Sequence, residues 1–118
     1  MVIRQGDVFW VDVGAPFGSE PGYRRPAVVV QGDAFNAGGI QTVVMCFLTS
    51  RPRYAGLPGN VALRKGEAGL PKRSVVNVTQ LATVDRARLV EKIGTVSRQR
   101  LGEVLDGIHL LLSPATKL

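Results

Sequence analysis

Residues 26–31, Pro-Ala-Val-Val-Val-Gln, and residues 43–48, Val-Val-Met-Cys-Phe-Leu, are the two apolar runs that decide the fold. Both are short and rich in β-branched residues, so they predict a pair of buried strands. Each strand meets a polar group at one end, because Arg25 precedes the first run and Thr49 follows the second. A permanently charged guanidinium and a neutral hydroxyl suit a phosphate better than a metal ion. This pair of side chains is therefore the first candidate for function.

The rest of the chain predicts further short strands, joined by connections rich in glycine and proline. Strands are expected at residues 7–13, 27–31, 41–49, 60–63, 74–78, 80–84 and 92–96. The segments at 14–25, 32–39 and 51–59 are expected to be loops. Asp85 is expected to cap a short helical turn that runs through Leu89. Many short strands with such connections indicate a small barrel or sandwich.

The C-terminal segment has a different pattern. Apolar residues recur at helical spacing between Leu101 and Leu112, which predicts an amphipathic helix over about residues 97–112. Ser97 is expected to cap the start of this helix, and Pro114 is expected to end it. The apolar face is expected to pack on the strands of the same domain.

Length and composition restrict the class of protein. The 118 residues are expected to form one domain, residues 1–118, and 45% hydrophobic with 20% charged residues is typical of a globular chain. No apolar run approaches the roughly 20 residues that cross a membrane. The N-terminus also lacks the pattern of a signal peptide. We therefore expect a cytoplasmic protein with no membrane partner.

Residues that bind metals are scarce. Cys46 is the only cysteine, His109 is the only histidine, and the nine acidic residues are scattered singly. Zinc and magnesium sites need clusters of such ligands, so neither a metal nor another cofactor is expected. Cys46 lies in an apolar run, where a buried and inert thiol is expected. The net charge of +6 and the pI of about 10.3 favour a polyanionic partner instead.

Metal-free cleavage of an RNA strand requires a 2′-OH to attack the adjacent phosphorus while the 5′-oxygen leaves. Arg25 suits the stabilisation of charge on the phosphate oxygens, and a guanidinium, which stays protonated in proteins, is a poor general base. Thr49 can donate a hydrogen bond to a phosphate oxygen. No histidine adjoins it in the sequence, so we do not expect it to be a covalent nucleophile.

Several motifs, in order and spacing, resemble those of the MazF/PemK-type toxins, the endoribonucleases of type II toxin–antitoxin pairs. The likeness runs from about residue 5 to residue 112, and the motifs are specific together although each is weak alone. The matching features are residues 6–12, 18–20, 25–29, 48–50, 74–81 and 83–85, together with Asn36, Leu89 and the terminal helix.

The resemblance implies a mainly β fold with a C-terminal helix, an SH3-like β-barrel of the MazF/CcdB/Kid toxin type, acting as a homodimer. It implies metal-independent, sequence-specific cleavage of single-stranded mRNA that leaves a 2′,3′-cyclic phosphate and a 5′-OH and so inhibits translation and growth. The catalytic arginine of the family falls on Arg25, and its catalytic threonine falls on Thr49. The implied partner is an antitoxin whose acidic, disordered tail crosses the basic RNA groove.

Further residues are candidates for RNA binding, each with a structural alternative. Ser19 and Glu20 either shape a turn or contact the RNA, with Glu20 assisting proton removal or fixing Arg25. Asn36 either caps a loop or reads a base edge, and Gln80 either contacts a base or only points outward from a strand. The candidate RNA-binding residues are Ser19, Glu20, Arg24, Asn36, Ser50, Arg53, Tyr54 and Gln80.

Two other functions compete with cleavage. One is a non-enzymatic toxin of the same fold class that resembles CcdB and poisons DNA gyrase by protein contact. The other is a nucleic-acid-binding module that has kept the fold and lost cleavage. Arg25 and Thr49 separate the first alternative from an endoribonuclease, because a gyrase poison needs no pair of groups that stabilises a phosphate.

Overall fold

The described part of the chain, residues 1–15 and 23–115 of a computed structural model, contains six strands and a long C-terminal helix. The strands are β1 (Asp7–Asp12), β2 (Arg24–Val29), β3 (Thr42–Thr49), β4 (Val61–Leu63), β5 (Ser74–Asp85) and β6 (Leu89–Thr95). The helices are α1 (Asp33–Asn36) and α2 (Arg98–Leu112), with short 3-10 turns η1 (Pro52–Gly56), η2 (Glu67–Gly69) and η3 (Arg86–Arg88). The expected mainly β fold with a C-terminal helix is confirmed.

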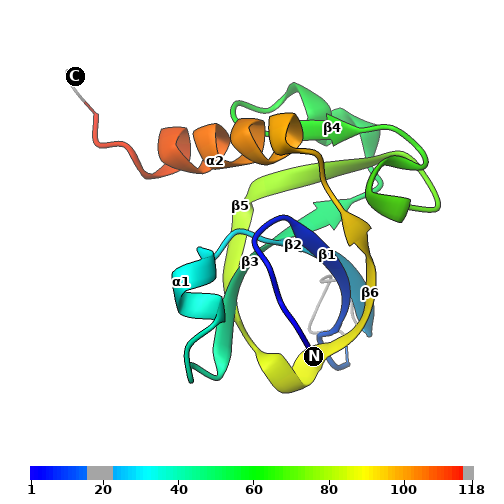
Figure 1. The fold of residues 1–118 in the computed structure, drawn as a ribbon. Helices are drawn as coiled ribbons and strands as arrows, with labels where there is room; N and C mark the ends of the chain where they lie inside the picture. Colours follow the sequence, from blue (N-terminus) through cyan, green and yellow to red (C-terminus); the bar gives the residue numbers. More distant parts are fainter. Residues whose placement is uncertain (16–22, 116–118) are drawn as a thin grey trace.

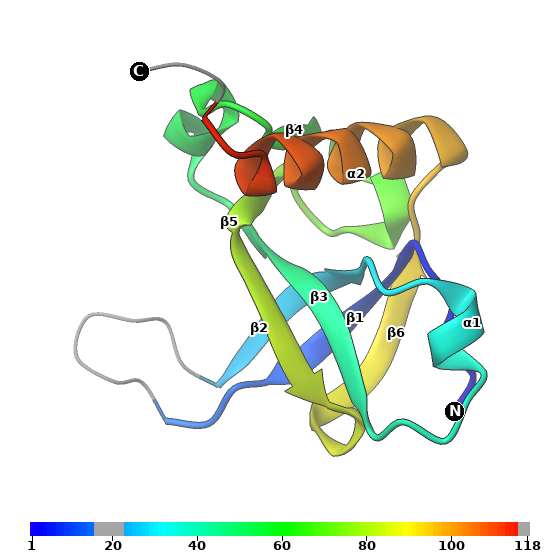
Figure 2. The same cartoon turned by 90° about the vertical axis from the view of Figure 1, so that its left-hand side faces the viewer.

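The strands form one antiparallel sheet in the order β4-β5-β3-β2-β1-β6, and this sheet curls strongly around its own interior (Figure 1). Helix α2 lies across one side of the curled sheet, over β4 and β5, in both views (Figure 2). Within the described ranges, no helix is long and apolar enough to cross a membrane.

The central strands are buried on both faces. Val8 and Val28 belong to a cluster that includes Val104 of α2, so they face the helix. Their neighbours Phe9 and Val29 belong to a second cluster inside the curl of the sheet. Because successive side chains of a strand point to opposite faces, burial on both sides requires continuous apolar residues instead of alternation. This explains the uninterrupted apolar runs of β2 and β3.

Glycines allow the backbones of distant segments to touch. A Cβ on Gly107 of α2 would lie 2.0 Å from the carbonyl oxygen of Gly59, which precedes β4. A Cβ on Gly94 of β6 would lie 2.1 Å from the carbonyl oxygen of Ala68 in η2. The first contact seats the helix against the start of β4, and the second joins η2 to the β6 edge of the sheet.

Three local predictions differ from the structure. The strands expected at 74–78 and 80–84 are one continuous strand, β5, with an irregular register between them. Residues 32–39 contain the short helix α1, and residues 51–59 contain η1, where loops were expected. Strand β2 begins at Arg24, so Arg24 and Arg25, which were expected in the loop at 14–25, are strand residues. The continuity of β5 and the start of β2 arise from pairing with distant strands, which local sequence does not encode. Helix α1 and turn η1 instead form through backbone hydrogen bonds within their own segments.

The two predicted caps are confirmed. The Asp85 carboxylate accepts a hydrogen bond of 2.8 Å from the backbone N–H of Ala87 and starts η3. The Ser97 hydroxyl accepts one of 3.1 Å from the backbone N–H of Arg100 and starts α2. Each cap satisfies a backbone donor that has no partner within its helix.

A charge cluster ties α2 to η2. The Arg100 guanidinium donates to Glu67 at 3.0 and 3.1 Å and to Glu103 at 2.9 Å. The hydrogen bond from Arg100, followed by one from the backbone N–H of Arg64, holds the pKa of Glu67 below its ordinary value. The partly buried pair therefore stabilises the fold only while Glu67 is ionised.

Substitution Gly107→Ala should destabilise the protein, because the new methyl group would collide with the Gly59 carbonyl. We expect a loss of about 1–3 kcal/mol in the free energy of unfolding, which outweighs the gain of up to about 1 kcal/mol in helix propensity. Gly102→Ala is the matched control, because Gly102 lies on the same helix with nothing within 4 Å of the added Cβ. Denaturant unfolding that ranks Gly107→Ala at or above Gly102→Ala would contradict the close contact.

The Glu67 carboxylate should contribute to the acid branch of the stability curve. Its pKa is lower in the folded than in the unfolded state, so the unfolded state binds more protons between these two values. The contribution is complete above the ordinary glutamate pKa of about 4.3 and is lost as the pH falls through the folded value. In Glu67→Gln this contribution is absent, so the stability difference between the two proteins should shrink on acidification. If the stability of the two proteins fell in parallel between neutral and strongly acidic pH, a contribution from ionised Glu67 would be excluded.

Candidate active site

The register of β2 with β3 brings the two candidate catalytic residues together. The strands are antiparallel, and their outermost rung pairs Ala27 with Phe47. Continuing this register by two residues along each strand places Arg25 across from Thr49, with both side chains on the same face. Pro26 is tolerated within β2 because pairing with β3 begins only at Ala27.

A pocket of about 390 Å³ opens at this end of the sheet. Arg24, Arg25 and Pro26 enter it from β2, and Thr49 and Ser50 enter it from the end of β3. The residues that line the pocket are Trp10, Arg24, Arg25, Pro26, Leu48, Thr49, Ser50, Arg51, Leu70, Pro71, Lys72 and Ser74. Four of the predicted site residues, Arg24, Arg25, Thr49 and Ser50, therefore line one small hollow.

Two neighbours among the described residues hold the Arg25 guanidinium. Its Nη2 donates a hydrogen bond of 2.7 Å to Oε1 of Gln80, which comes from β5. Its Cζ lies 4.7 Å from the centre of the Phe47 ring, within the range of a cation–π contact. Phe47 precedes Thr49 by two residues on β3, so one strand face supplies both the ring beneath the cation and the hydroxyl beside it.

The Thr49 hydroxyl accepts a hydrogen bond of 3.2 Å from the backbone N–H of Arg51. A hydroxyl oxygen that accepts one bond still carries its own proton for donation. The side chain is half-buried, so a ligand in the pocket can reach it. Thr49 is thus arranged as a hydrogen-bond donor toward an anion.

The charges around the pocket all have one sign. Arg24, Arg51 and Lys72 are exposed around Arg25, and no carboxylate is found among the described residues that line the hollow. Cationic groups within a small concave surface raise the local concentration of an anion. The cations around the pocket therefore suit the binding of a phosphate.

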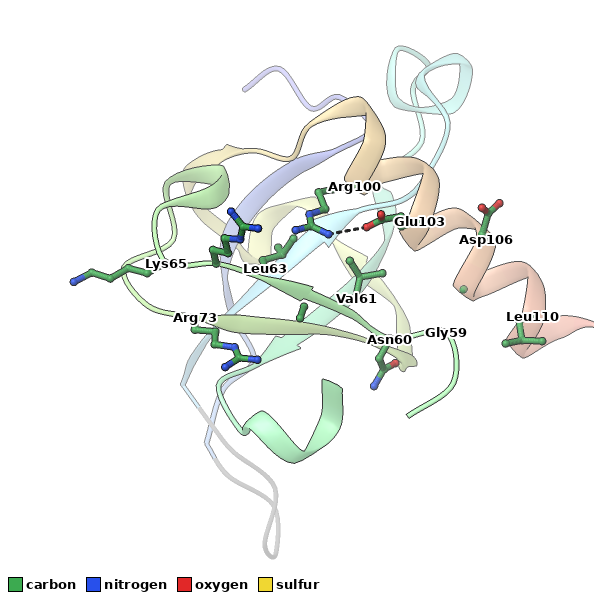
Figure 3. A pocket seen from close by; sticks show the side chains of 13 residues that line it. Gly59, Asn60, Val61, Leu63, Lys65, Arg73, Arg100, Glu103, Asp106 and Leu110 are labelled. Carbon is green, nitrogen blue, oxygen red and sulfur yellow. Dashed lines mark hydrogen bonds and ion pairs between the residues drawn. The ribbon is translucent and has the colours of Figure 1, made fainter. Parts of the chain in front are cut away.

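A larger hollow of about 960 Å³ lies between β4 and α2 and has a different character. Figure 3 shows Lys65 and Arg73 on one side of it, with Glu103 and Asp106 on the helix opposite. Arg100 in this hollow is already paired with Glu103 and with Glu67. Its charges are mixed and partly compensated, so we place the active site in the smaller pocket.

The other predicted residues lie elsewhere. Ser19 and Glu20 fall outside the described residues. Asn36 is buried in α1, at the end of the molecule away from the start of β2 (Figure 2), and its amide bonds Gln31 and Asp33. The structure does not bring Asn36 together with Arg25, and its contact with RNA stays a prediction.

Arg53 and Tyr54 lie in η1, beyond the end of β3. The Arg53 guanidinium lies 5.2 Å over the Tyr54 ring, and Arg53 itself is exposed. Asn60 donates a hydrogen bond of 3.0 Å to the Tyr54 carbonyl and anchors the turn. Neither side chain lines the pocket, so the two residues form a separate cationic and aromatic surface along the chain from Thr49.

Sequence reasoning missed three residues of the site. Trp10, for which a core or dimer position is the simpler expectation, lines the pocket from β1. Lys72, for which the sequence leaves open a solvated position or an extension of the basic groove, was not chosen as a site residue but lines the same hollow. In the sequence, Phe47 cannot be distinguished from the core residues of its apolar run, although its ring contacts the Arg25 guanidinium. The residues of this place that the sequence did predict are Arg24, Arg25, Thr49, Ser50 and Gln80.

The described residues contain no cluster of side chains that could hold a metal ion. No group of three or more histidine, cysteine, aspartate or glutamate side chains occurs in residues 1–15 and 23–115. Cys46 is fully buried between the strands, and burial raises the pKa of its thiol to about 12. A neutral thiol in the core is no nucleophile at physiological pH.

Comparison with known proteins gives a consistent result. The family model described as PemK-like, MazF-like toxin of type II toxin-antitoxin system matches residues 4–112. The chain is 39% identical over 112 residues to Endoribonuclease MazF6 of Mycobacterium tuberculosis H37Rv, covering 95% of this chain and 98% of that protein. It is 35% identical over 111 residues to Endoribonuclease MazF of Staphylococcus saprophyticus, covering 94% and 92%.

Solved structures share the fold. A MazE-MazF structure from Deinococcus radiodurans superposes with a TM-score of 0.77 at 28% identity, covering 98% of this chain and 99% of the other. A mycobacterial endoribonuclease in complex with its cognate antitoxin gives a TM-score of 0.75 at 22% identity, covering 96% and 99%. The curled sheet with its crossing helix is therefore the architecture of known toxins.

The buried thiol should resist modification. In the folded protein at pH 8, a thiol reagent such as DTNB should react with Cys46 far more slowly than in urea, because the sulfur is inaccessible and its pKa is about 12. The absorbance of the released thiolate measures the rate. A rate in native buffer equal to that in urea would show that β3 opens readily.

Proposed function

Because this chain belongs to the PemK-like, MazF-like toxins of type II toxin–antitoxin systems, we propose that Arg25 and Thr49 are the catalytic pair of an endoribonuclease. The observation that supports this assignment is that both residues line one pocket, together with further cations. The curated relatives are named endoribonucleases and match almost the whole chain. A CcdB-like gyrase poison is therefore not favoured.

In the proposed mechanism, the scissile phosphate of a single-stranded RNA enters the pocket between β2 and β3. The ribose 2′-OH attacks phosphorus and loses its proton. The bond to the 5′-oxygen breaks and that oxygen takes up a proton, so the products are a 2′,3′-cyclic phosphate and a 5′-OH. Arg25 binds the non-bridging oxygens and stabilises the charge that they gain in the transition state. Thr49 donates a hydrogen bond to one of these oxygens. No step requires a metal.

The surrounding residues would bind the rest of the substrate. Arg24 and Ser50 line the same pocket and are placed to contact flanking phosphates or ribose. Arg53 and Tyr54 offer a cation and a ring on which an unpaired base can stack. Ser19 and Glu20 remain candidates by resemblance.

The partners follow from the same chemistry. Structures of relatives include an endoribonuclease with its cognate antitoxin and a MazE-MazF pair, and an acidic antitoxin segment would compete with RNA for the cationic pocket. We propose a homodimer as the active form and the cytoplasm, where mRNA is translated, as its place of action.

The mechanism predicts large effects of two single substitutions. Purified protein should cleave a single-stranded mRNA transcript in excess EDTA and leave cyclic-phosphate ends. Arg25→Ala should lower the rate by about 100- to 1000-fold, in line with the loss of a principal donor to the transition state. Thr49→Ala should lower it by about tenfold, the loss of one neutral hydrogen bond. The rates are read from initial fragment formation on denaturing gels.

Arg98→Ala is the control for charge, because it removes an exposed arginine at the start of α2, outside the pocket lining. Its rate should stay close to that of the unaltered protein. Intact RNA in chelator, or cleavage only after a metal is added, would refute the proposed mechanism.

A further inference from the structure

Strand β5 contains a bulge beside the proposed catalytic arginine. Cys46 pairs with Leu81 and Leu48 pairs with Val76, so between these rungs β3 supplies only Phe47 while β5 supplies residues 77–80. Extra residues on one strand bend it and turn a side chain away from the direction that regular pairing would give. Gln80 is the last residue of the bulge, immediately before regular pairing resumes.

A polar network fixes the shape of this bulge. The amide oxygen of the buried Asn77 accepts hydrogen bonds from the backbone N–H and hydroxyl of Thr79, at 3.2 and 2.7 Å. The amide oxygen of Asn60 accepts from the backbone N–H of Val78 at 2.9 Å. Side chains thus satisfy donors that the ladder leaves unpaired, and the bulge has one defined conformation.

The bulge delivers Gln80 to Arg25. Oε1 of Gln80 accepts from Nη2 of Arg25 at 2.7 Å, across 55 residues of sequence. The Phe47 ring beneath the guanidinium restricts its plane, and the Gln80 contact restricts its rotation within that plane. Together they fix the direction in which the remaining N–H groups point.

The Gln80 side chain that accepts from Arg25 is a neutral amide and not a carboxylate. In the other hollow, Arg100 is held by two carboxylates, Glu67 and Glu103, which compensate its cation. An amide oxygen orients a guanidinium as a carboxylate does but brings no negative charge of its own. The chain therefore uses carboxylates on a structural arginine and an amide on the arginine of the cationic pocket.

We propose that Gln80 is a positioning residue that orients the Arg25 guanidinium toward the scissile phosphate, and is not a reader of RNA bases. This inference rests on the proposed function of Arg25. It differs from the expectation of a base contact, because the side-chain oxygen of Gln80 is already engaged by the catalytic cation.

Three substitutions of Gln80 separate orientation from charge. Gln80→Ala and Gln80→Met both remove the acceptor, and methionine keeps nearly the length of glutamine. Both should lower the single-turnover rate at saturating protein by about tenfold to 100-fold, because a misplaced catalytic group costs rate. Binding of a 2′-O-methyl RNA, which cannot be cleaved, should change by less than about threefold. Gln80→Glu keeps the acceptor but adds a charge, so it should mainly weaken RNA binding.

The cleavage pattern distinguishes positioning from base reading. If Gln80 orients Arg25, the Gln80→Met protein cuts the same positions of an mRNA transcript as the unaltered protein, all more slowly. Altered cleavage positions with an unchanged rate at those retained would assign Gln80 to base recognition and overturn the proposal. Gln99→Ala, which removes an exposed glutamine on α2, should change neither rate nor positions.

A second background tests whether Gln80 acts through Arg25. In Arg25→Lys the planar fork is absent, so adding Gln80→Met should cost less than about threefold further. A full additional loss of rate in the Arg25→Lys background would contradict the proposal.

Side-chain ¹⁵N NMR of Arg25 gives a readout without cleavage, because Gln80→Met should release rotation about the Nε–Cζ bond of Arg25. Unaltered protein that leaves RNA intact would refute the proposed function, whereas normal cleavage by Gln80→Met would refute only the role of Gln80.

Discussion

The antiparallel pairing of β2 with β3 is the constraint on which the rest of the structure depends. Both faces of these strands are buried, with Val28 toward α2 and Val29 toward the interior of the sheet. A slip of one residue would turn every side chain of a strand to the wrong face. The same slip would move Thr49 to the face opposite Arg25. The register of these two strands therefore determines both the packing of the core and the positions of the two candidate catalytic groups.

Arg100 and Arg25 lie in different electrostatic surroundings. Arg100 is tied to carboxylates and serves to join α2 to η2. Arg25 is held by an aromatic ring and a neutral amide, with further cations around it. Further cations beside a guanidinium are unfavourable for stability and favourable for an anionic ligand. This difference in electrostatics, more than the size of the two hollows, distinguishes a surface for structure from a surface for chemistry.

Much of this arrangement could be predicted from the sequence. The strands around Val28 and Met45 follow from runs of β-branched and apolar residues, and the caps at Asp85 and Ser97 follow from local side-chain chemistry. The pairing of Arg25 with Thr49 follows once the two runs are taken as antiparallel neighbours.

The remainder depends on contacts between distant residues. Gln80 meets Arg25 across 55 residues, and Arg100 meets Glu67 across 33. The continuity of β5 through its bulge depends on Asn60, a residue outside the strand that binds its unpaired backbone. Local propensity carries no information about such contacts. For this reason the strands were predicted well and the supports of the site were not.

The location of the site on central strands has a consequence for its durability. Arg25, Phe47, Thr49 and Gln80 belong to β2, β3 and β5, neighbouring strands in the middle of the sheet. Such strands exchange their amide hydrogens only through the largest opening events of a protein, whereas loops open locally and often. The supports of the proposed catalytic pair should therefore stay assembled through local fluctuations. Heat should abolish catalysis only when it melts the molecule as a whole.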